Sequence, residues 1–213
     1  MICAAGVDFF LQLDLDLLKF GNIIVANSVF DAVMPVITNL AYWRIPVILA
    51  LAVLALFGGR YGLVSVVLGV ILIAITDQLS STLLKDLVGR VRPCHVVPDL
   101  RVLAGCGNSK SFPSSHAANT MAAALFFGFR YRKMLPWLLG LSILVSYSRV
   151  YIGIHYPSDL AGGWLIGALC AAVVLLIHHR VQRRWPNIEH TRSWPWVKKL
   201  LHRPEDAKRQ PEG

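Results

Sequence analysis

Charged residues are scarce in this chain. Of its 213 residues, 15% are charged and 55% are hydrophobic, whereas a soluble domain usually carries roughly 25% charged residues. A single globular core does not need so large an apolar excess, so the composition indicates a membrane protein. The apolar excess also excludes intrinsic disorder, and the lack of a sustained heptad pattern excludes a long coiled coil. Four cysteines are too few for a disulfide-dense mini-protein.

Acidic residues are also few, and the basic excess is unevenly placed. The chain has 21 Lys and Arg against 12 Asp and Glu, a net charge of +9. Residues 1–40 carry four Asp against one Lys, whereas residues 178–213 carry nine Lys and Arg against four acids. A basic stretch directly after an apolar segment is typical of the cytoplasmic flank of a membrane span. The expected partner is therefore the lipid bilayer and not nucleic acid.

Long uncharged runs locate the expected spans, because a helix that crosses the hydrocarbon needs about 20 mostly apolar residues. Five runs qualify when the first is lengthened upstream, and they are residues 45–57, 61–84, 114–129, 134–148 and 160–177. Residues 22–40 mix Asn, Asp and Pro with apolar residues, which suits an interfacial or re-entrant helix as well as a sixth span. The sequence predicts an all-α, polytopic transmembrane helical bundle of five to six spans with an amino-terminal interfacial or re-entrant segment.

This pattern divides the chain into three parts. Residues 1–40 are expected to form an amphipathic, interfacial segment, residues 41–178 the transmembrane core, and residues 179–213 a basic cytoplasmic tail. No basic region precedes an apolar run at the amino terminus, so no cleavable signal peptide is evident and the first span is expected to serve as its own signal. In the last span, a stripe of small residues at Gly163 and Gly167 predicts close packing within the chain in preference to dimerisation.

Basic clusters set the expected orientation. Residues 130–133 read Arg-Tyr-Arg-Lys, and the order of the spans places them on the same side as the basic tail. Because clustered Lys and Arg mark the cytoplasmic side, the loop between Lys85 and Phe112 and the loop around His155 should be extracytoplasmic.

Three short polar segments interrupt the apolar pattern at the expected extracytoplasmic ends of spans. They are residues 85–93, 112–116 and 148–159. Singly, each allows an ordinary role: the basic residues can anchor headgroups, Ser114 can cap a helix, and His155 can bond Asp159 within a loop. Together they predict a site for an anion that undergoes substitution.

The basic residues and serines of these segments suit a phosphoryl group. Lys85 contributes a point charge, and Arg92 and Arg149 contribute planar forks that match phosphoryl oxygens. Ser114 and Ser115 open a predicted span, so free backbone amides and the positive helix end face the same place. The sequence therefore predicts a phosphate cradle.

Two histidines complete the predicted chemistry, since displacement at phosphorus needs a nucleophile on one side and a proton donor for the leaving oxygen on the other. Asp159 lies four residues after His155 and can hold one ring nitrogen while the other faces phosphorus. His155 is therefore the expected nucleophile. His116, at the cradle helix, is the expected acid.

These segments resemble the three-part signature of the type 2 phosphatidic acid phosphatase superfamily. The matching residues are Lys85-x6-Arg92-Pro93, Pro113-Ser114-Ser115-His116 and Ser148-Arg149-x5-His155-x3-Asp159. The order and spacing of three separated parts make the match far more specific than one short motif. The chain departs from the usual pattern at Ser115, where the superfamily commonly has Gly, and this affects the expected geometry of the cradle.

The resemblance implies a bacterial inner-membrane enzyme, with its site on the periplasmic side, that removes phosphate from a lipid through a phosphohistidine on His155. It implies no metal or other cofactor, and the extracytoplasmic loops contain no cluster of acids that would hold a pair of cations. Among the substrates that the resemblance suggests, undecaprenyl diphosphate and phosphatidylglycerol phosphate are favoured over lipid A phosphate. A lipid phosphotransferase of the same superfamily and, less readily, an anion transporter are the alternatives. The sequence predicts no oligomeric state.

Two further features stand outside the motifs. Asp77 lies inside a predicted span, where it could pair with Lys85 or Arg149, or form a hydrogen bond between helices. Cys94 and Cys106 share the extracytoplasmic loop, so we predict a disulfide between them, while Cys3 and Cys170 should remain reduced. The pairing would hold the first motif near the second.

Overall fold

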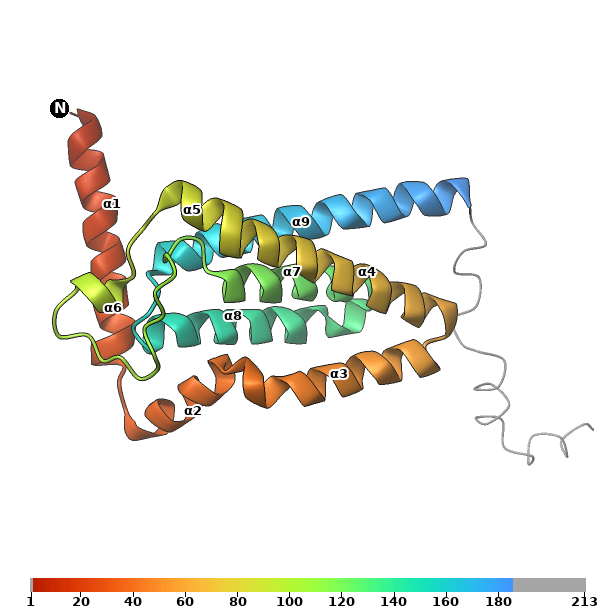
Figure 1. The fold of residues 1–213 in the computed structure, drawn as a ribbon, viewed down its shortest axis with the longest axis horizontal. Coiled ribbons are helices and arrows are strands. Elements are labelled where there is room, and N and C mark those ends of the chain that lie inside the picture. Colours follow the sequence, from red (N-terminus) through yellow and green to blue (C-terminus); the bar gives the residue numbers. More distant parts are fainter. Residues whose placement is uncertain (1, 186–213) are drawn as a thin grey trace, which may run out of the picture.

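The computed structural model describes residues 2–185, with side chains from residue 8 onward (Figure 1). The predicted basic tail therefore lies almost entirely outside the described residues, as does the Cys3 side chain. No strand occurs in the described part, which is helical as predicted. Its α-helices are α1 (Ile2–Lys19), α2 (Ser28–Thr38), α3 (Leu40–Phe57), α4 (Gly59–Gln78), α5 (Leu84–Val88), α6 (Pro93–Val96), α7 (Ser115–Arg130), α8 (Leu135–Tyr151) and α9 (Pro157–Arg184). Two π-helical segments, Phe20–Ile24 and Leu79–Leu83, follow α1 and α4, and a 3-10 turn, Arg132–Met134, precedes α8.

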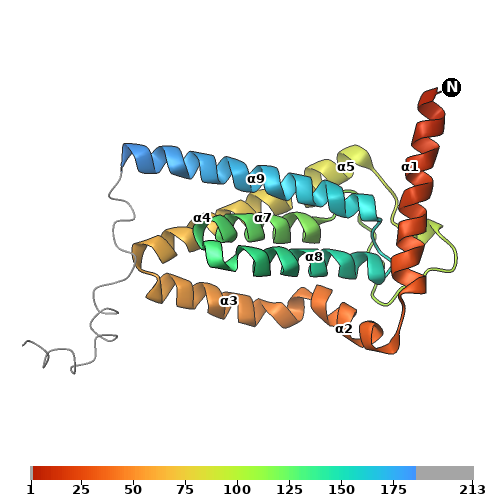
Figure 2. The same ribbon diagram turned by 180° about the vertical axis from the view of Figure 1, so that it is seen from behind.

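Five long helices form the bundle. In Figures 1 and 2, α3, α4, α7, α8 and α9 run along one common direction, and α1 crosses one end of them. Small residues bring α9 against α7: a Cβ added to Gly163 would lie 2.6 Å from the Ser114 carbonyl oxygen, and one on Gly167 would lie 2.3 Å from that of Ala118. This contact confirms the predicted close packing of the small-residue stripe within the chain.

Three described helical stretches are long and apolar enough to cross a membrane: Leu40–Phe57, the stretch Gly59–Val96 that contains α4, and Pro157–Arg184. Asp8–Ile24 and Ser28–Thr38 would form a fourth if they make one span, but they are bent by 116° at the break between them. At 16 and 17 residues, α7 and α8 are about 25 Å long, slightly short of the usual span. The prediction of a polytopic helical protein agrees with these lengths, which give three or four candidate spans by length and composition, against the five to six that the sequence predicts.

The extended loop at the end of the bundle crossed by α1 is fastened to the amino-terminal segment. Asn22, which is completely buried, donates to the carbonyl oxygens of Arg101 (2.8 Å) and Tyr151 (2.6 Å). Its own side-chain oxygen accepts from the Arg101 backbone N–H at 2.9 Å. Cys94 and Cys106 are joined by a disulfide, with their Cα atoms 6.3 Å apart, whereas Cys170 is free. The segment between α6 and α7 is thus held by the hydrogen bonds of Asn22 and by the disulfide.

Candidate active site

The three polar segments meet at the end of the bundle crossed by α1. Lys85 lies in α5, Arg92 precedes α6, and α7 begins beside them with Ser115 and His116. Arg149 stands near the end of α8, His155 in the turn between α8 and α9, and Asp159 in the first turn of α9. Figure 1 shows these helix ends together. The fold therefore brings together residues that are up to 74 positions apart in the sequence.

The best-defined pair in the site is His155 and Asp159. His155 Nδ1 lies 3.2 Å from Asp159 Oδ2, and both side chains are buried. The same carboxylate oxygen accepts from the Tyr156 backbone N–H at 2.9 Å and from the Ser111 hydroxyl. With Nδ1–H donating to this fixed carboxylate, Nε2 carries the lone pair that can attack an electrophile. Burial lowers the pKa of His155 to about 4, against the opposing effect of the hydrogen bond to Asp159, so the ring is neutral at pH 7.

Three cations surround this histidine without a carboxylate partner. Lys85 and Arg92 are buried, and neither they nor Arg149 forms an ion pair with any residue that the structure describes. Lys85 lies close enough to both arginines to interact with them electrostatically. Buried like charges are costly unless an anion offsets them. The cage is therefore complementary to an anion of high charge, such as a phosphoryl group.

Backbone and hydroxyl groups orient the two guanidinium groups. Arg92 donates from Nε to the Ser109 carbonyl oxygen and from Nη2 to the Ser109 hydroxyl, each at 2.8 Å, and its Nη1 lies 3.5 Å from His155 Nε2. Arg149 Nη1 donates to the Thr38 hydroxyl at 2.6 Å, while its buried Nε has no partner among the described residues. Both forks are thus held by neutral groups, which leaves their charge for a ligand.

The two serines of the predicted cradle differ in what they do. Ser114 caps α7: its hydroxyl accepts from the Ala117 backbone N–H, and its own N–H donates to the Asp159 carbonyl oxygen at 3.0 Å. The Ser115 hydroxyl is buried and has no partner among the described residues. Ser114 therefore fastens the cradle helix to α9, and Ser115 is the serine with an unused hydroxyl.

His116 occupies the second position of α7. It interacts electrostatically with Arg149, His155 and Lys85, and its ring is hydrogen-bonded to the backbone of Thr38. The structure thus brings the two predicted catalytic histidines to one site. The end of α2 closes it, a contribution from Thr38 that no motif in the sequence indicates.

Arg90 and Asp14 were not predicted as part of the site. Arg90 donates to Asp159 Oδ1 at 2.8 Å and to Asp14 Oδ2 at 2.6 Å, and its guanidinium carbon stacks 3.8 Å from the centre of the Tyr156 ring. Asp14 also accepts from the Ser158 backbone N–H at 2.8 Å. The sequence gives no signal for either residue, because a basic residue at a membrane surface can have many roles and Asp14 belongs to no motif. Only the contact in the folded structure identifies this pair.

Asp77 bonds across helices, which is one of the two alternatives that the sequence left open. Its Oδ1 accepts from Asn119 Nδ2 in α7 at 2.8 Å. No ion pair joins Asp77 to a cation within the described residues. Asp77 is therefore a polar link between α4 and α7.

One group of metal-ligand types lies outside the cage. Cys94, His95 and Cys106 lie close enough to share an ion. The two sulfurs are bonded to each other, however, which leaves a single imidazole for coordination. This group does not suit a metal in the disulfide state.

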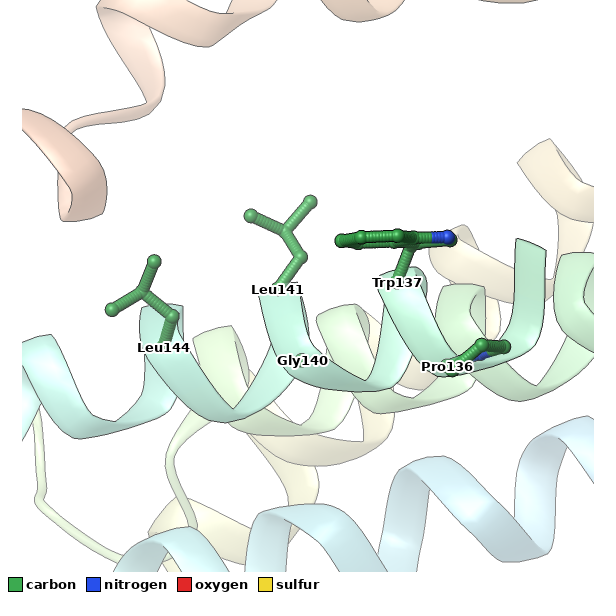
Figure 3. A pocket seen from close by; sticks show the side chains of 5 residues that line it. All are labelled: Pro136, Trp137, Gly140, Leu141 and Leu144. Carbon is green, nitrogen blue, oxygen red and sulfur yellow. The ribbon is translucent and has the colours of Figure 1, made fainter.

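An apolar groove of about 560 Å³ lies on one face of α8. In Figure 3 the side chains of Trp137, Leu141 and Leu144 point the same way from the helix, with Gly140 leaving space between them. Leu144 precedes Arg149 by five residues, or about 7.5 Å along the helix. An apolar chain in this groove would therefore run up toward the cage.

Known proteins resemble this chain over most of its length. The family model of the PAP2 superfamily matches residues 62–183. The lipid A 4'-phosphatase of Bacteroides thetaiotaomicron is 32% identical over 189 residues, which cover 84% of this chain and 82% of that protein. The decaprenylphosphoryl-5-phosphoribose phosphatase of Mycobacterium tuberculosis is 42% identical over 94 residues, which cover 44% of this chain and about half (51%) of that protein.

A solved structure shares the fold. The crystal structure of a transmembrane PAP2-type phosphatidylglycerolphosphate phosphatase from Bacillus subtilis superposes with a TM-score of 0.66 at 25% identity, covering 85% of this chain and 93% of that one. The match of the family model to more than half of the chain, and the relative aligned over more than four-fifths of it, show that this protein belongs to the PAP2 superfamily.

Proposed function

We propose that this protein is an integral-membrane lipid phosphatase that works through a phosphohistidine on His155. The observation that carries the proposal is a neutral, carboxylate-oriented histidine inside a cage of three cations that have no carboxylate partner among the described residues. Such a cage stabilises the charge on a phosphoryl group during its transfer, and the histidine supplies a nucleophile. The activities named for the relatives support the same reaction class.

In the first step, His155 Nε2 attacks phosphorus and the bond from phosphorus to the leaving oxygen breaks. His116 gives its proton to that oxygen, so the lipid departs as an alcohol, or as a lipid monophosphate when the substrate is a diphosphate. The carboxylate of Asp159 stabilises the positive charge that develops on the His155 ring. Lys85, Arg92 and Arg149 hold the three equatorial oxygens, with the free amides of the cradle at Ser115.

In the second step, water attacks the phosphohistidine. His116, now neutral, takes a proton from that water, the bond from phosphorus to Nε2 breaks, and inorganic phosphate leaves. The protons balance over the cycle, because the one that His116 gave to the lipid is replaced by one from water. If a lipid hydroxyl took the place of water, the same residues would make a phosphotransferase.

In the membrane, we place α3, α4, α7, α8 and α9 as five spans, with the bent segment before α3 at the interface. The basic turn at residues 130–133 lies at the end of the bundle opposite the cage and suits the cytoplasmic side. The cage then faces the periplasm of a bacterial inner membrane. Exposed apolar side chains along α3 and α9 are what a lipid-facing surface requires.

For the substrate, we favour undecaprenyl diphosphate or phosphatidylglycerol phosphate, each of which carries a terminal phosphate on a long apolar tail. The groove on α8 supports a tail that lies along this helix. The names of the relatives cover sugar, prenyl and glycerol lipids, and all of these relatives are phosphatases.

The test is release of inorganic phosphate by the full chain in detergent, from each of these two lipids, with and without a lipid alcohol as acceptor. We expect phosphate release by the wild type, and none by His155→Ala. His95→Ala is the matched control, since that histidine lies in the same loop region outside the cage. Transfer to the acceptor without phosphate release would identify a phosphotransferase, and no reaction with any lipid phosphate would contradict the proposal.

A further inference from the structure

A second polar group lies deeper in the membrane than the phosphate cage. Both α4 and α7 run away from the cage, and Asp77 and Asn119 face each other one to two turns along them, 2.8 Å apart. Asn119 follows His116 by three residues and Ser115 by four, so all three share one side of α7. The π-helical segment Leu79–Leu83 begins directly after α4, and such segments are frequent at functional sites.

The unused hydrogen-bonding capacity of this group is mostly that of an acceptor. Asn119 donates an N–H to Asp77, whereas its Oδ1 atom is buried and has no partner among the described residues. The second carboxylate oxygen of Asp77 receives only a long contact of 3.5 Å from the Ser81 hydroxyl, which bonds the Asp77 carbonyl oxygen at 2.6 Å instead. The buried Asn119 Oδ1 atom is costly without a donor, and Asp77 beside it is exposed and can be reached, so a ligand that donates hydrogen bonds would be stabilised here.

The charge of Asp77 narrows the class of ligand further. A second phosphoryl group is anionic and, when fully ionised, offers acceptors only, so it would meet another anion and another acceptor. A hydroxyl or amide group is neutral and donates. The group at Asp77 and Asn119 is therefore suited to hydroxyls and unsuited to the inner phosphate of a diphosphate.

The order along the membrane normal matches one arrangement of substrate. The cage holds the terminal phosphate, Asp77 and Asn119 lie next below it, and apolar surface follows. We infer that Asp77 and Asn119 form a subsite for the hydroxyls of a sugar or polyol that joins the phosphate to the apolar tail. This inference rests on the proposed phosphatase and selects among its substrates: it favours phosphate esters of hydroxyl-bearing headgroups, such as phosphatidylglycerol phosphate, over undecaprenyl diphosphate.

The test compares three synthetic substrates with the same tail: dodecyl glucoside 6-phosphate, dodecyl phosphate and dodecyl diphosphate. We expect the wild type to favour the sugar phosphate over both others in kcat/KM. Asp77→Asn removes the charge at constant shape and should lower the ratio of sugar phosphate to diphosphate at least tenfold, with a rise on the diphosphate itself. Asn119→Leu should lower the ratio of sugar phosphate to dodecyl phosphate through KM. Gln78→Ala, on the same helix, is the control and should leave both ratios unchanged.

The outcomes separate the subsite from the phosphatase and from a merely structural link. Equal losses on all three substrates would show that Asp77 and Asn119 only join the helices, and this would overturn the subsite. Hydrolysis without preference for the sugar phosphate would do the same while leaving the phosphatase in place. No phosphate release from any of the three by the wild type would overturn the proposed function together with this inference.

Discussion

Arg90 donates to Asp159, the residue that orients the proposed nucleophile His155, at 2.8 Å. Its other Nη atom donates to Asp14 in α1 at 2.6 Å, so one guanidinium bridges two carboxylates that are 145 residues apart. Asp159 in turn holds His155. Since Arg90 reaches His155 only through Asp159, we propose that it is a positioning residue for the proposed nucleophile.

We predict that Arg90→Lys lowers kcat by about 10-fold or more with little change in KM. A lysine keeps the charge but lacks the planar fork that serves both carboxylates at once. Steady-state kinetics with a soluble aryl phosphate would measure this. Arg60→Lys, an exposed arginine at the other end of the bundle, is the control. An equal loss of kcat in both variants would contradict the positioning role of Arg90.

Removal of the two histidines should have different chemical consequences. His155→Ala should abolish turnover with every substrate. His116→Ala should lose about 10²-fold with an alkyl phosphate, because the leaving oxygen needs a proton. The same variant should recover much of its phosphorylation rate with p-nitrophenyl phosphate, since that leaving group departs as an anion. The measurement is rapid-quench detection of the acid-labile phosphoenzyme. A phosphoenzyme in His155→Ala would contradict the assigned nucleophile.

The His155 ring should titrate well below an ordinary histidine. Its pKa of about 4 is set first by burial. The unfolded chain takes up a proton near pH 6.5, so the folded state loses stability as the pH falls from about 6.5 toward 4 and is unaffected by this group above that range. NMR of labelled histidine in detergent, with the His155 signal assigned from His155→Ala, would follow it. Titration near 6.5 would show an imidazole exposed to water.

How much of this site the sequence predicts depends on how each residue is connected. His155 and Asp159 are four residues apart and their contact is local, so spacing suffices. The helical class and the small-residue stripe of α9 follow from composition and periodicity. Asp14 and Thr38 reach the site only because the amino-terminal segment bends by 116° and returns to the bundle. A bend of that kind depends on tertiary packing, and tertiary packing leaves no local pattern in the sequence from which these two contacts could be predicted.

Ser115 tests whether the serine hydroxyl itself binds phosphate. If the backbone amide of this residue does the binding, Ser115→Gly should keep the rate within about tenfold, a barrier change near 1.4 kcal/mol. The hydroxyl is buried and has no partner among the described residues, so its removal leaves no other group unsatisfied. Ser114→Ala removes the cap of α7 and should lower the stability of the fold by about 1 kcal/mol. A loss of several hundredfold in Ser115→Gly would assign the hydroxyl to a phosphoryl oxygen.

The disulfide between Cys94 and Cys106 should support the cage through the loop that it closes. Ser109 and Ser111 lie three and five residues after Cys106, and they hold Arg92 and Asp159. The bridge joins residues 12 apart, and closing a loop of this size restricts the unfolded chain by roughly 3 kcal/mol. We therefore predict that the double substitution Cys94→Ser and Cys106→Ser lowers both the melting temperature and kcat.

Cys170→Ala, which changes the free cysteine in α9, is the control for that variant and should leave kcat within about threefold, because no part of the cage rests on it. Alkylation of the wild-type protein without reductant, followed by intact-mass measurement, determines whether the bridge forms. If Cys94 and Cys106 both alkylate freely, the bridge is absent and so is its support of the cage. Such a result would also weaken the placement of this loop on the periplasmic side, where an oxidising environment is what keeps a bridge of this kind closed.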